Sequence, residues 1–149
     1  MSKRIALIHG PNLNLLGQRD PDMYGSSSLA ELEETVGAQA HRHGVELHTF
    51  QSNVEGELIN ALHDAQRDCI GVIFNPGGYS HTSVALRDAV EAISIPVIEV
   101  HLSNIHARED FRKRSLTAEA ATSCISGMGV HGYLAAMDAL TGSASSPFG

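Results

Sequence analysis

Residues 4–9, Arg-Ile-Ala-Leu-Ile-His, place four consecutive apolar side chains between two polar ones and predict a β-strand. A strand with no polar position at its centre is typical of a parallel sheet that is covered on both faces. Four further segments predict strands at residues 45–50, 70–74, 97–100 and 123–126. The chain can therefore form a sheet of five strands.

Helical patterns separate these strands. Ser28, with Glu31 three residues later, forms a capping box, and the apolar spacing that follows predicts a helix that ends at Gly44. Similar spacing predicts helices over residues 55–67, 83–92 and 130–140. The alternation predicts an α/β fold, a doubly wound sandwich around a five-stranded parallel sheet, because 149 residues are too few for the eight units of a barrel.

The composition predicts one domain. Of the 149 residues, 42% are hydrophobic and 18% charged, which is enough apolar material for a single core over residues 1–140. The Ser-, Gly- and Pro-rich residues 141–149 are expected to form a flexible C-terminal tail. Seventeen acidic residues against ten basic ones give a net charge of −7, which argues against nucleic acid or an anionic membrane as a partner.

The sequence also favours a cytoplasmic location. No apolar run approaches the ~20 residues that cross a bilayer, and the run after Arg4 is too short for a signal peptide. Cys69 and Cys124 fit neither a disulfide framework nor a CxxC metal site, and both lie in apolar surroundings. We expect both to be buried free thiols, as in a reducing compartment.

Most of the unusual polar residues fall in three segments that follow predicted strands, namely 10–25, 75–83 and 101–108. In open α/β sheets, ligands bind beyond the carboxyl ends of the strands, near the point where the strand order reverses. These three segments are therefore the expected place of the functional site.

Residues 127–132, Gly-Met-Gly-Val-His-Gly, match the GxGxxG pattern of dinucleotide-binding sites. Such a site also needs a following strand and an acidic residue about 20 positions further on. Only seventeen residues follow Gly132. We expect these glycines to serve a tight turn and close helix packing, and we expect no nicotinamide cofactor.

Nine histidines raise the question of a metal site. Glu99 lies two residues before His101, so both side chains point to the same side of a strand. A carboxylate beside a histidine suits the orientation of a general acid or base better than half of a metal site, and we expect no metal. The chain has two lysines, Lys3 and Lys113, and we expect neither to be the desolvated amine that Schiff-base chemistry needs. Ser103 lies outside any GxSxG motif.

Tyr24 and Arg19 share one irregular segment, and a guanidinium group favours the ionised form of a nearby phenol. Arg108 and Arg112, four residues apart, lie on one face if their segment is helical. The alternative is that the three arginines pair with nearby acids, namely Asp20, Asp22, Glu109 and Asp110. The residues alone leave both interpretations open.

The chain resembles the type II 3-dehydroquinate dehydratases over about residues 4–140. The motifs that carry the resemblance are His9-Gly-Pro-Asn-Leu-Asn-Leu-Leu-Gly17, Arg19 to Gly25, Gln51-Ser-Asn53, Asn75-Pro-Gly-Gly-Tyr-Ser-His-Thr-Ser83, Glu99-Val-His-Leu-Ser-Asn104, Arg108-Glu109 with Phe111-Arg112, and Gly127 to Tyr133. Gly78, Ser80 and the pair Ser123-Cys124 depart from the family pattern without removing a functional group. The resemblance implies a flavodoxin-like fold, no cofactor, and a homododecamer built as a tetramer of trimers.

The resemblance also implies a reaction, the dehydration of 3-dehydroquinate to 3-dehydroshikimate in the shikimate pathway of aromatic amino-acid biosynthesis. Tyr24, as tyrosinate, removes a proton from C2, and Arg19 and Arg108 favour its charged form. The product of this step is an enolate. His101, oriented by Glu99, then protonates the departing C1 hydroxyl, which makes the elimination anti overall.

Further roles are implied for residues that bind the substrate. Asn12 holds a water that donates a hydrogen bond to the enolate oxygen. The other binding residues are Asn75, His81 and Arg112, the backbone amides of Leu102 and Ser103 for the carboxylate, and Asp88, which reaches the site of a neighbouring subunit. Backbone amides explain how an acidic protein binds an anionic substrate.

Gly17 and Gly25 flank the segment that carries Arg19 and Tyr24, and we expect this segment to close over the site as a lid. Two alternatives belong to other classes. A flavin-carrying electron-transfer module has the same sheet but needs a hydroxyl-rich loop after the first strand, whereas residues 10–14 read Gly-Pro-Asn-Leu-Asn. The second alternative is another enolate-forming lyase that acts on a related cyclic polyol acid.

Overall fold

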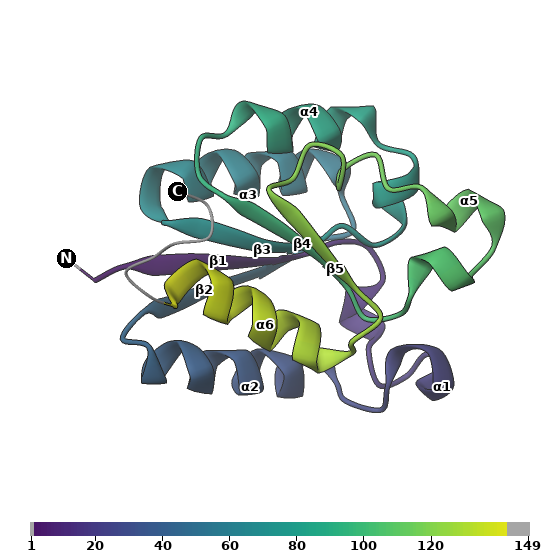
Figure 1. Ribbon diagram of the computed structural model, residues 1–149, viewed down its shortest axis with the longest axis horizontal. Coiled ribbons are helices and arrows are strands. Elements are labelled where there is room, and N and C mark those ends of the chain that lie inside the picture. The colour runs from purple at the N-terminus through teal and green to yellow at the C-terminus, as the bar shows by residue number, and fades with distance from the viewer. Residues whose placement is uncertain (1, 143–149) are drawn as a thin grey trace.

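Five parallel strands form one sheet in the computed structural model, which describes residues 2–142 (Figure 1). The strand order is β2-β1-β3-β4-β5, the order of flavodoxin-like proteins. In chain order the strands are β1 (Arg4–His9), β2 (Glu46–Gln51), β3 (Gly71–Asn75), β4 (Val97–His101) and β5 (Ser123–Ser126). The predicted doubly wound fold is confirmed.

Helices cover both faces of this sheet. Helices α2 and α6 lie on one face, and α3 and α4 lie on the other (Figure 1). The helices are α1 (Pro21–Tyr24), α2 (Leu29–Arg42), α3 (Glu55–Asp68), α4 (Val84–Ala92), α5 (Asp110–Lys113) and α6 (Val130–Thr141), with short 3-10 turns η1 (Leu13–Leu15), η2 (Gly77–His81) and η3 (Ile105–Ala107).

Strand β1 explains why this chain folds as three layers. Ile5 and Leu7 belong to the core beneath α2 and α6, whereas Ala6 and Ile8 belong to the core beneath α3 and α4. All four side chains are buried, because successive residues of a strand point to opposite faces. Burial of one isoleucine or leucine side chain contributes about 1.5–3 kcal/mol, so the uninterrupted apolar run stabilises both layers at once.

The predicted helices and strands are present, with ends that differ by one or two residues. The capping box of α2 is formed, with the Glu31 amide donating to Ser28 Oγ at 3.1 Å. Helices α1 and α5 were not predicted, because four residues are too few to show helical periodicity. Helix α6 continues to Thr141, the first residue of the predicted tail, and residues 143–149 lie outside the described residues.

The glycines at 127–132 have the structural role that the sequence predicted. Gly127 and Gly129 adopt φ of +86° and +57° in the turn that leads into α6. At Gly132, a Cβ atom would lie 3.2 Å from side-chain atoms of both Ile125 and Val100. The first two glycines therefore form the turn, and the third lets α6 pack closely on the sheet.

Both cysteines were expected to be buried, and the structure confirms this for one of them. Cys69 is buried as predicted, but the prediction that Cys124 is buried is wrong, because this residue lies on the edge strand β5 and is exposed. Both are free thiols. Within residues 2–142, no helix has the length and apolar character that a membrane crossing requires.

The strands β1, β3 and β4 all end at the same edge of the sheet, where α1 and α5 also lie (Figure 1). The chain order changes direction between β1 and its neighbour β3, since β2 lies on the other side of β1. This is the switch point at which doubly wound sheets bind ligands.

Candidate active site

A cavity of about 150 Å³ opens at this edge of the sheet. It is lined by ten of the twelve residues that the sequence singled out. They come from the last residues of β3 and β4 and from the segments that follow β1, β3 and β4: Asn12, Arg19, Tyr24, Asn75, His81, His101, Leu102, Ser103, Arg108 and Arg112. Glu99 lies behind the cavity and contacts His101. Asp88 does not line the cavity of its own chain; it is exposed on α4.

Tyr24 lies against two arginines. Arg19 Nη2 donates a hydrogen bond to the phenolic oxygen at 3.2 Å, and its guanidinium carbon lies 4.4 Å from the ring centre. The Arg108 guanidinium carbon lies 5.4 Å from the same ring centre. Two guanidinium groups therefore face the Tyr24 ring, and one of them contacts its oxygen.

The local structure of residues 19–24 brings Tyr24 close to Arg19. Asp20 caps α1 by accepting from the amide of Asp22 at 3.1 Å, and Pro21 occupies the first helical position. The short helix thereby turns the chain so that Tyr24 approaches Arg19, five residues earlier. Of the three arginines, Arg112 alone pairs with an acid within residues 2–142, with its Nε 2.6 Å from Glu109.

Arg108 retains an unused donor. Its Nη1 donates to Ser103 Oγ at a long 3.4 Å, and its buried Nε has no hydrogen-bond partner within residues 2–142. Buried donors are normally paired, and exceptions concentrate at functional sites. Arg108 precedes α5 rather than lying on a helix with Arg112, yet both line the cavity.

His101 and Glu99 form a buried pair at the carboxyl end of β4. His101 Nε2 lies 2.6 Å from Glu99 Oε2, and the two side chains are 7% and 1% exposed. A carboxylate oxygen accepts, so this nitrogen carries the hydrogen and the ring orientation is fixed. The His81 ring stacks on that of His101, with 6.5 Å between their centres.

Asn75 is held at both ends of its amide. Its Nδ2 donates to the Tyr133 hydroxyl at 2.9 Å, and its Oδ1 accepts from the Gly77 amide at 3.0 Å. Burial raises the pKa of the Tyr133 phenol far above its ordinary value, so this hydroxyl stays neutral and accepts from Asn75. The sequence placed Tyr133 inside a motif but gave it no role.

Two further residues of the site were not predicted. Ser115 and Thr117 both hydrogen-bond to the carboxylate of Glu99, Ser115 at 2.6 Å. They lie sixteen and eighteen residues beyond Glu99, in the segment between α5 and β5. The only available signal was two hydroxyl residues at i and i+2 in a region without regular structure.

A metal ion has one set of potential ligands in the described part of the chain. Donor atoms of Glu99, His101 and Cys124 lie within 4.8 Å of one another. The Glu99 carboxylate already accepts hydrogen bonds from three side chains, so a metal would have to displace them. The donor set therefore suits proton transfer better than metal binding.

Cys124 carries a prediction of its own. Its sulfur faces Glu99, and desolvation together with the charge of that carboxylate raises the pKa of the thiol to about 11. We expect iodoacetamide to alkylate Cys124 at pH 8 roughly tenfold or more slowly than free cysteine, because the reactive thiolate is scarce. Mass spectrometry of the labelled peptide measures this rate, which should increase as the pH is raised towards 11. Rapid labelling at pH 8 would contradict it.

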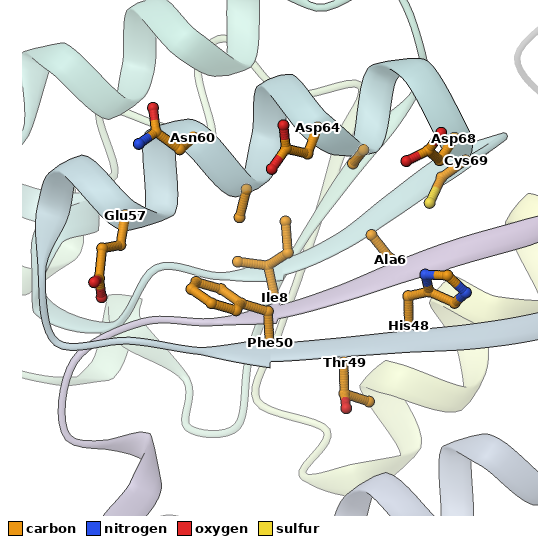
Figure 2. A pocket seen from close by; sticks show the side chains of 12 residues that line it. Ala6, Ile8, His48, Thr49, Phe50, Glu57, Asn60, Asp64, Asp68 and Cys69 are labelled. Carbon is orange, nitrogen blue, oxygen red and sulfur yellow. The ribbon is translucent and has the colours of Figure 1, made fainter.

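A larger cavity, about 350 Å³, lies between α3 and the strands β1 and β2 (Figure 2). Ile8 and Phe50 point into it from the strands, whereas Thr49 points to the other side of the sheet. Its α3 wall carries Asp64 and Asp68. None of the predicted site residues lines it, and its acidic wall is unsuited to an anionic ligand.

Comparisons with known proteins agree on one family. The family model described as "Dehydroquinase class II" matches residues 3–141. The chain is 51% identical to a protein of Halothermothrix orenii named 3-dehydroquinate dehydratase, over 92% of this chain and 93% of that protein. It is also 51% identical to a Neosartorya fischeri protein named catabolic 3-dehydroquinase 2, over 90% and 89% of the two chains.

A solved structure gives the same result. The crystal structure of type II dehydroquinase from Propionibacterium acnes superposes with a TM-score of 0.92 at 36% identity, covering 96% of this chain and 99% of that one. Since the sequence match and the structural match both span nearly the whole chain, the protein belongs to the class II dehydroquinase family.

Proposed function

We propose that this chain converts 3-dehydroquinate to 3-dehydroshikimate and water by elimination through an enolate. The observation that carries the proposal is the juxtaposition, in one cavity, of Tyr24 with two arginines and of His101 with Glu99. A base and an acid of this kind are what an elimination requires, one to take a proton from carbon and one to protonate the departing oxygen. Family membership supplies the substrate.

Tyr24 acts as the base. The ionised phenol takes the C2 proton of the substrate, and the electrons of the broken C–H bond pass into the ketone to give the enolate. Arg19 and Arg108 favour the phenolate, and exclusion of water from the site strengthens their attraction for it. The hydrogen bond from Arg19 to the phenolic oxygen, at 3.2 Å, supports this role.

Asn12 stabilises the enolate. This residue adopts a left-handed backbone conformation, with φ of 70°, and its backbone amide donates to Asn53 Oδ1 at 2.9 Å. Non-glycine residues in this conformation cost about 1–3 kcal/mol and concentrate at functional sites. Held in this way beside the cavity, the Asn12 side chain orients a water that donates a hydrogen bond to the developing oxyanion.

His101 acts as the acid. Its ring gives a proton to the C1 hydroxyl as the C–O bond breaks, so that the enolate electrons form the new double bond and water leaves. Glu99 orients the ring and stabilises its protonated form. Overall, one proton and one hydroxide leave the substrate from opposite faces.

Substrate binding falls to the remaining residues of the cavity. The backbone amides of Leu102 and Ser103 take the carboxylate, since consecutive amides form anion-binding concavities. Asn75, His81 and Arg112 bind the hydroxyl and ketone oxygens. The exposed position of Asp88 on α4 is compatible with a role in a neighbouring subunit, in a homododecamer formed as a tetramer of trimers.

The segment between Gly17 and Gly25 acts as a lid. Both glycines have positive φ, 88° and 84°, which other residues rarely adopt, and they enclose Arg19 and Tyr24. Movement about these two points brings the arginine and the tyrosine to the substrate together, which couples closure of the site to activation of the base.

Replacement of Arg19 by alanine tests that coupling. We expect Arg19→Ala to lower the rate at neutral pH by about tenfold and to move the acidic limb of the kcat/KM profile to higher pH, because the phenolate loses a cation. Arg42→Ala, at the exposed end of α2, is the matched control. An acidic limb that stays in place in Arg19→Ala shows that Arg19 does not influence the charge of Tyr24.

The activity itself is tested by supplying 3-dehydroquinate to the purified chain and following the ultraviolet absorbance of the conjugated enone product. A steady rise in absorbance, without added metal or cofactor, is the expected result. If the absorbance does not change while calorimetry detects binding of 3-dehydroquinate, the cavity serves a different reaction.

A further inference from the structure

Glu99 is fully buried and makes an unusual set of contacts. Its carboxylate accepts hydrogen bonds from His101 Nε2 at 2.6 Å, from Ser115 Oγ at 2.6 Å, and from Thr117 Oγ1. Ser115 is 7% exposed and Thr117 is fully buried. Two neutral hydroxyls therefore contact the same carboxylate that contacts His101.

The hydroxyls solve a physical problem that burial creates. An ionised carboxylate in an apolar interior is costly unless its oxygens receive hydrogen bonds. Within residues 2–142, the only charged or chargeable partner in an ion pair with Glu99 is His101. A lysine or arginine in place of the hydroxyls would neutralise the carboxylate. Ser115 and Thr117 instead solvate it and leave its negative charge to act on His101.

The segment that carries these hydroxyls is fixed to η2 by two hydrogen bonds. The Leu116 amide donates to the Ser80 carbonyl at 2.7 Å, and the Arg114 carbonyl accepts from His81 Nδ1 at 2.9 Å. The Ala118 amide donates to Ser115 Oγ at 3.1 Å, which closes a turn above Glu99. The hydroxyls are thereby preorganised, and the segment also reaches the residues beside the cavity.

We propose that Ser115 and Thr117 are positioning residues that keep Glu99 ionised and directed at His101, and that they thereby set the pH range over which His101 holds its proton. The proposal rests on the function given above, in which His101 protonates the leaving hydroxyl. It assigns the segment between α5 and β5 a part in the reaction although neither residue lines the cavity.

Other titratable and charged groups lie near Glu99 and His101, and their own titrations must be told apart from that of His101. Cys124 on β5 is neutral at working pH, since the pKa of its thiol is raised to about 11. Arg108, Arg112 and Tyr24 line the same cavity. His81 on η2 stacks on His101. It is also a histidine, the residue type that ordinarily changes charge between pH 5 and 8.

The sign of the expected change follows from the contacts. Loss of one hydroxyl makes the ionised form of Glu99 less favourable, so the carboxyl takes up a proton more readily. His101 then loses its negative partner and releases its own proton at lower pH. In Thr117→Val, which keeps the shape of the side chain, the basic limb of the kcat profile should move to lower pH.

Steady-state kinetics and NMR test this together. We expect Thr117→Val and Ser115→Ala to lower kcat by about tenfold at neutral pH with little change in KM, and Thr117→Ser to restore the wild-type profile. Thr35→Val, which removes a hydroxyl from the exposed face of α2, is the control. Histidine ring nitrogen signals give the His101 titration directly, and His81→Gln assigns the two stacked rings.

The outcomes separate the two proposals. The NMR titration needs no turnover, so a chain without dehydratase activity contradicts the proposed function, while the His101 titration still tests the hydroxyls. A folded Thr117→Val chain with an unchanged kcat profile and His101 titration overturns the inference. So does a Thr117→Ser chain as impaired as Thr117→Val, since that result indicates packing alone. If Thr117→Val does not fold, Ser115→Ala is judged by the same criteria.

Discussion

Tyr24→Phe is expected to remove nearly all turnover, with kcat lower by about 10²–10⁴-fold, and to leave substrate binding within a few-fold of its wild-type value. The change deletes one oxygen, which accepts a hydrogen bond from Arg19 at 3.2 Å. It leaves the ring in contact with the guanidinium groups of Arg19 and Arg108. In the proposed reaction that oxygen is the atom that takes the C2 proton, so its loss removes the base. Steady-state rates and calorimetry with the product measure the two quantities separately.

Tyr79→Phe is the matched control for this experiment. Its hydroxyl donates to the Asn53 carbonyl at 2.8 Å, and it does not line the cavity, so the same deletion there should leave kcat unchanged. A Tyr24→Phe enzyme that retains substantial turnover would show that another group is the base.

His101→Ala is expected to lower kcat by about 10²–10⁴-fold while leaving the first half of the reaction intact. Tyr24 still removes and returns the C2 proton, so the substrate should exchange this hydrogen with deuterium from D2O even though hydroxide cannot leave. Proton NMR of the recovered substrate measures the exchange. Tyr24→Phe, in contrast, should lose both exchange and elimination.

His106→Ala is the control for His101, because it is an exposed histidine in the same segment. Its rate and its exchange should match those of the unmodified chain. Loss of exchange in His101→Ala together with loss of elimination would place His101 in the proton-abstraction step and would reverse the roles given to the two residues.

The sequence specified the sheet well because burial there leaves a direct pattern. Residues 5–8 are apolar at every position, and each of them is buried in one of the two layers. Cys124 shows the limit of that reasoning, since an apolar neighbourhood in sequence does not reveal that β5 is an edge strand. The position of a strand in the sheet depends on pairing between distant segments, which a local pattern does not contain.

Site residues could be predicted where they belong to a local sequence motif. They could not be predicted where only the folded chain brings them to the site. Glu99 and His101, two positions apart on one strand, had to share a face, and they do. Thr117 meets the same carboxylate only because the chain returns over β4 after α5. The short helix α1, which turns Tyr24 towards Arg19, was likewise invisible to periodicity.

The most direct measurement is a crystal structure of the protein bound to an unreactive analogue of 3-dehydroquinate, read for the distance between Tyr24 Oη and ring carbon 2. We expect about 3–3.5 Å, the range of reacting atoms, with the Arg19 guanidinium still on the phenolic oxygen. A Tyr24 oxygen that points away from that carbon, with no guanidinium beside it, would contradict the assignment of the base.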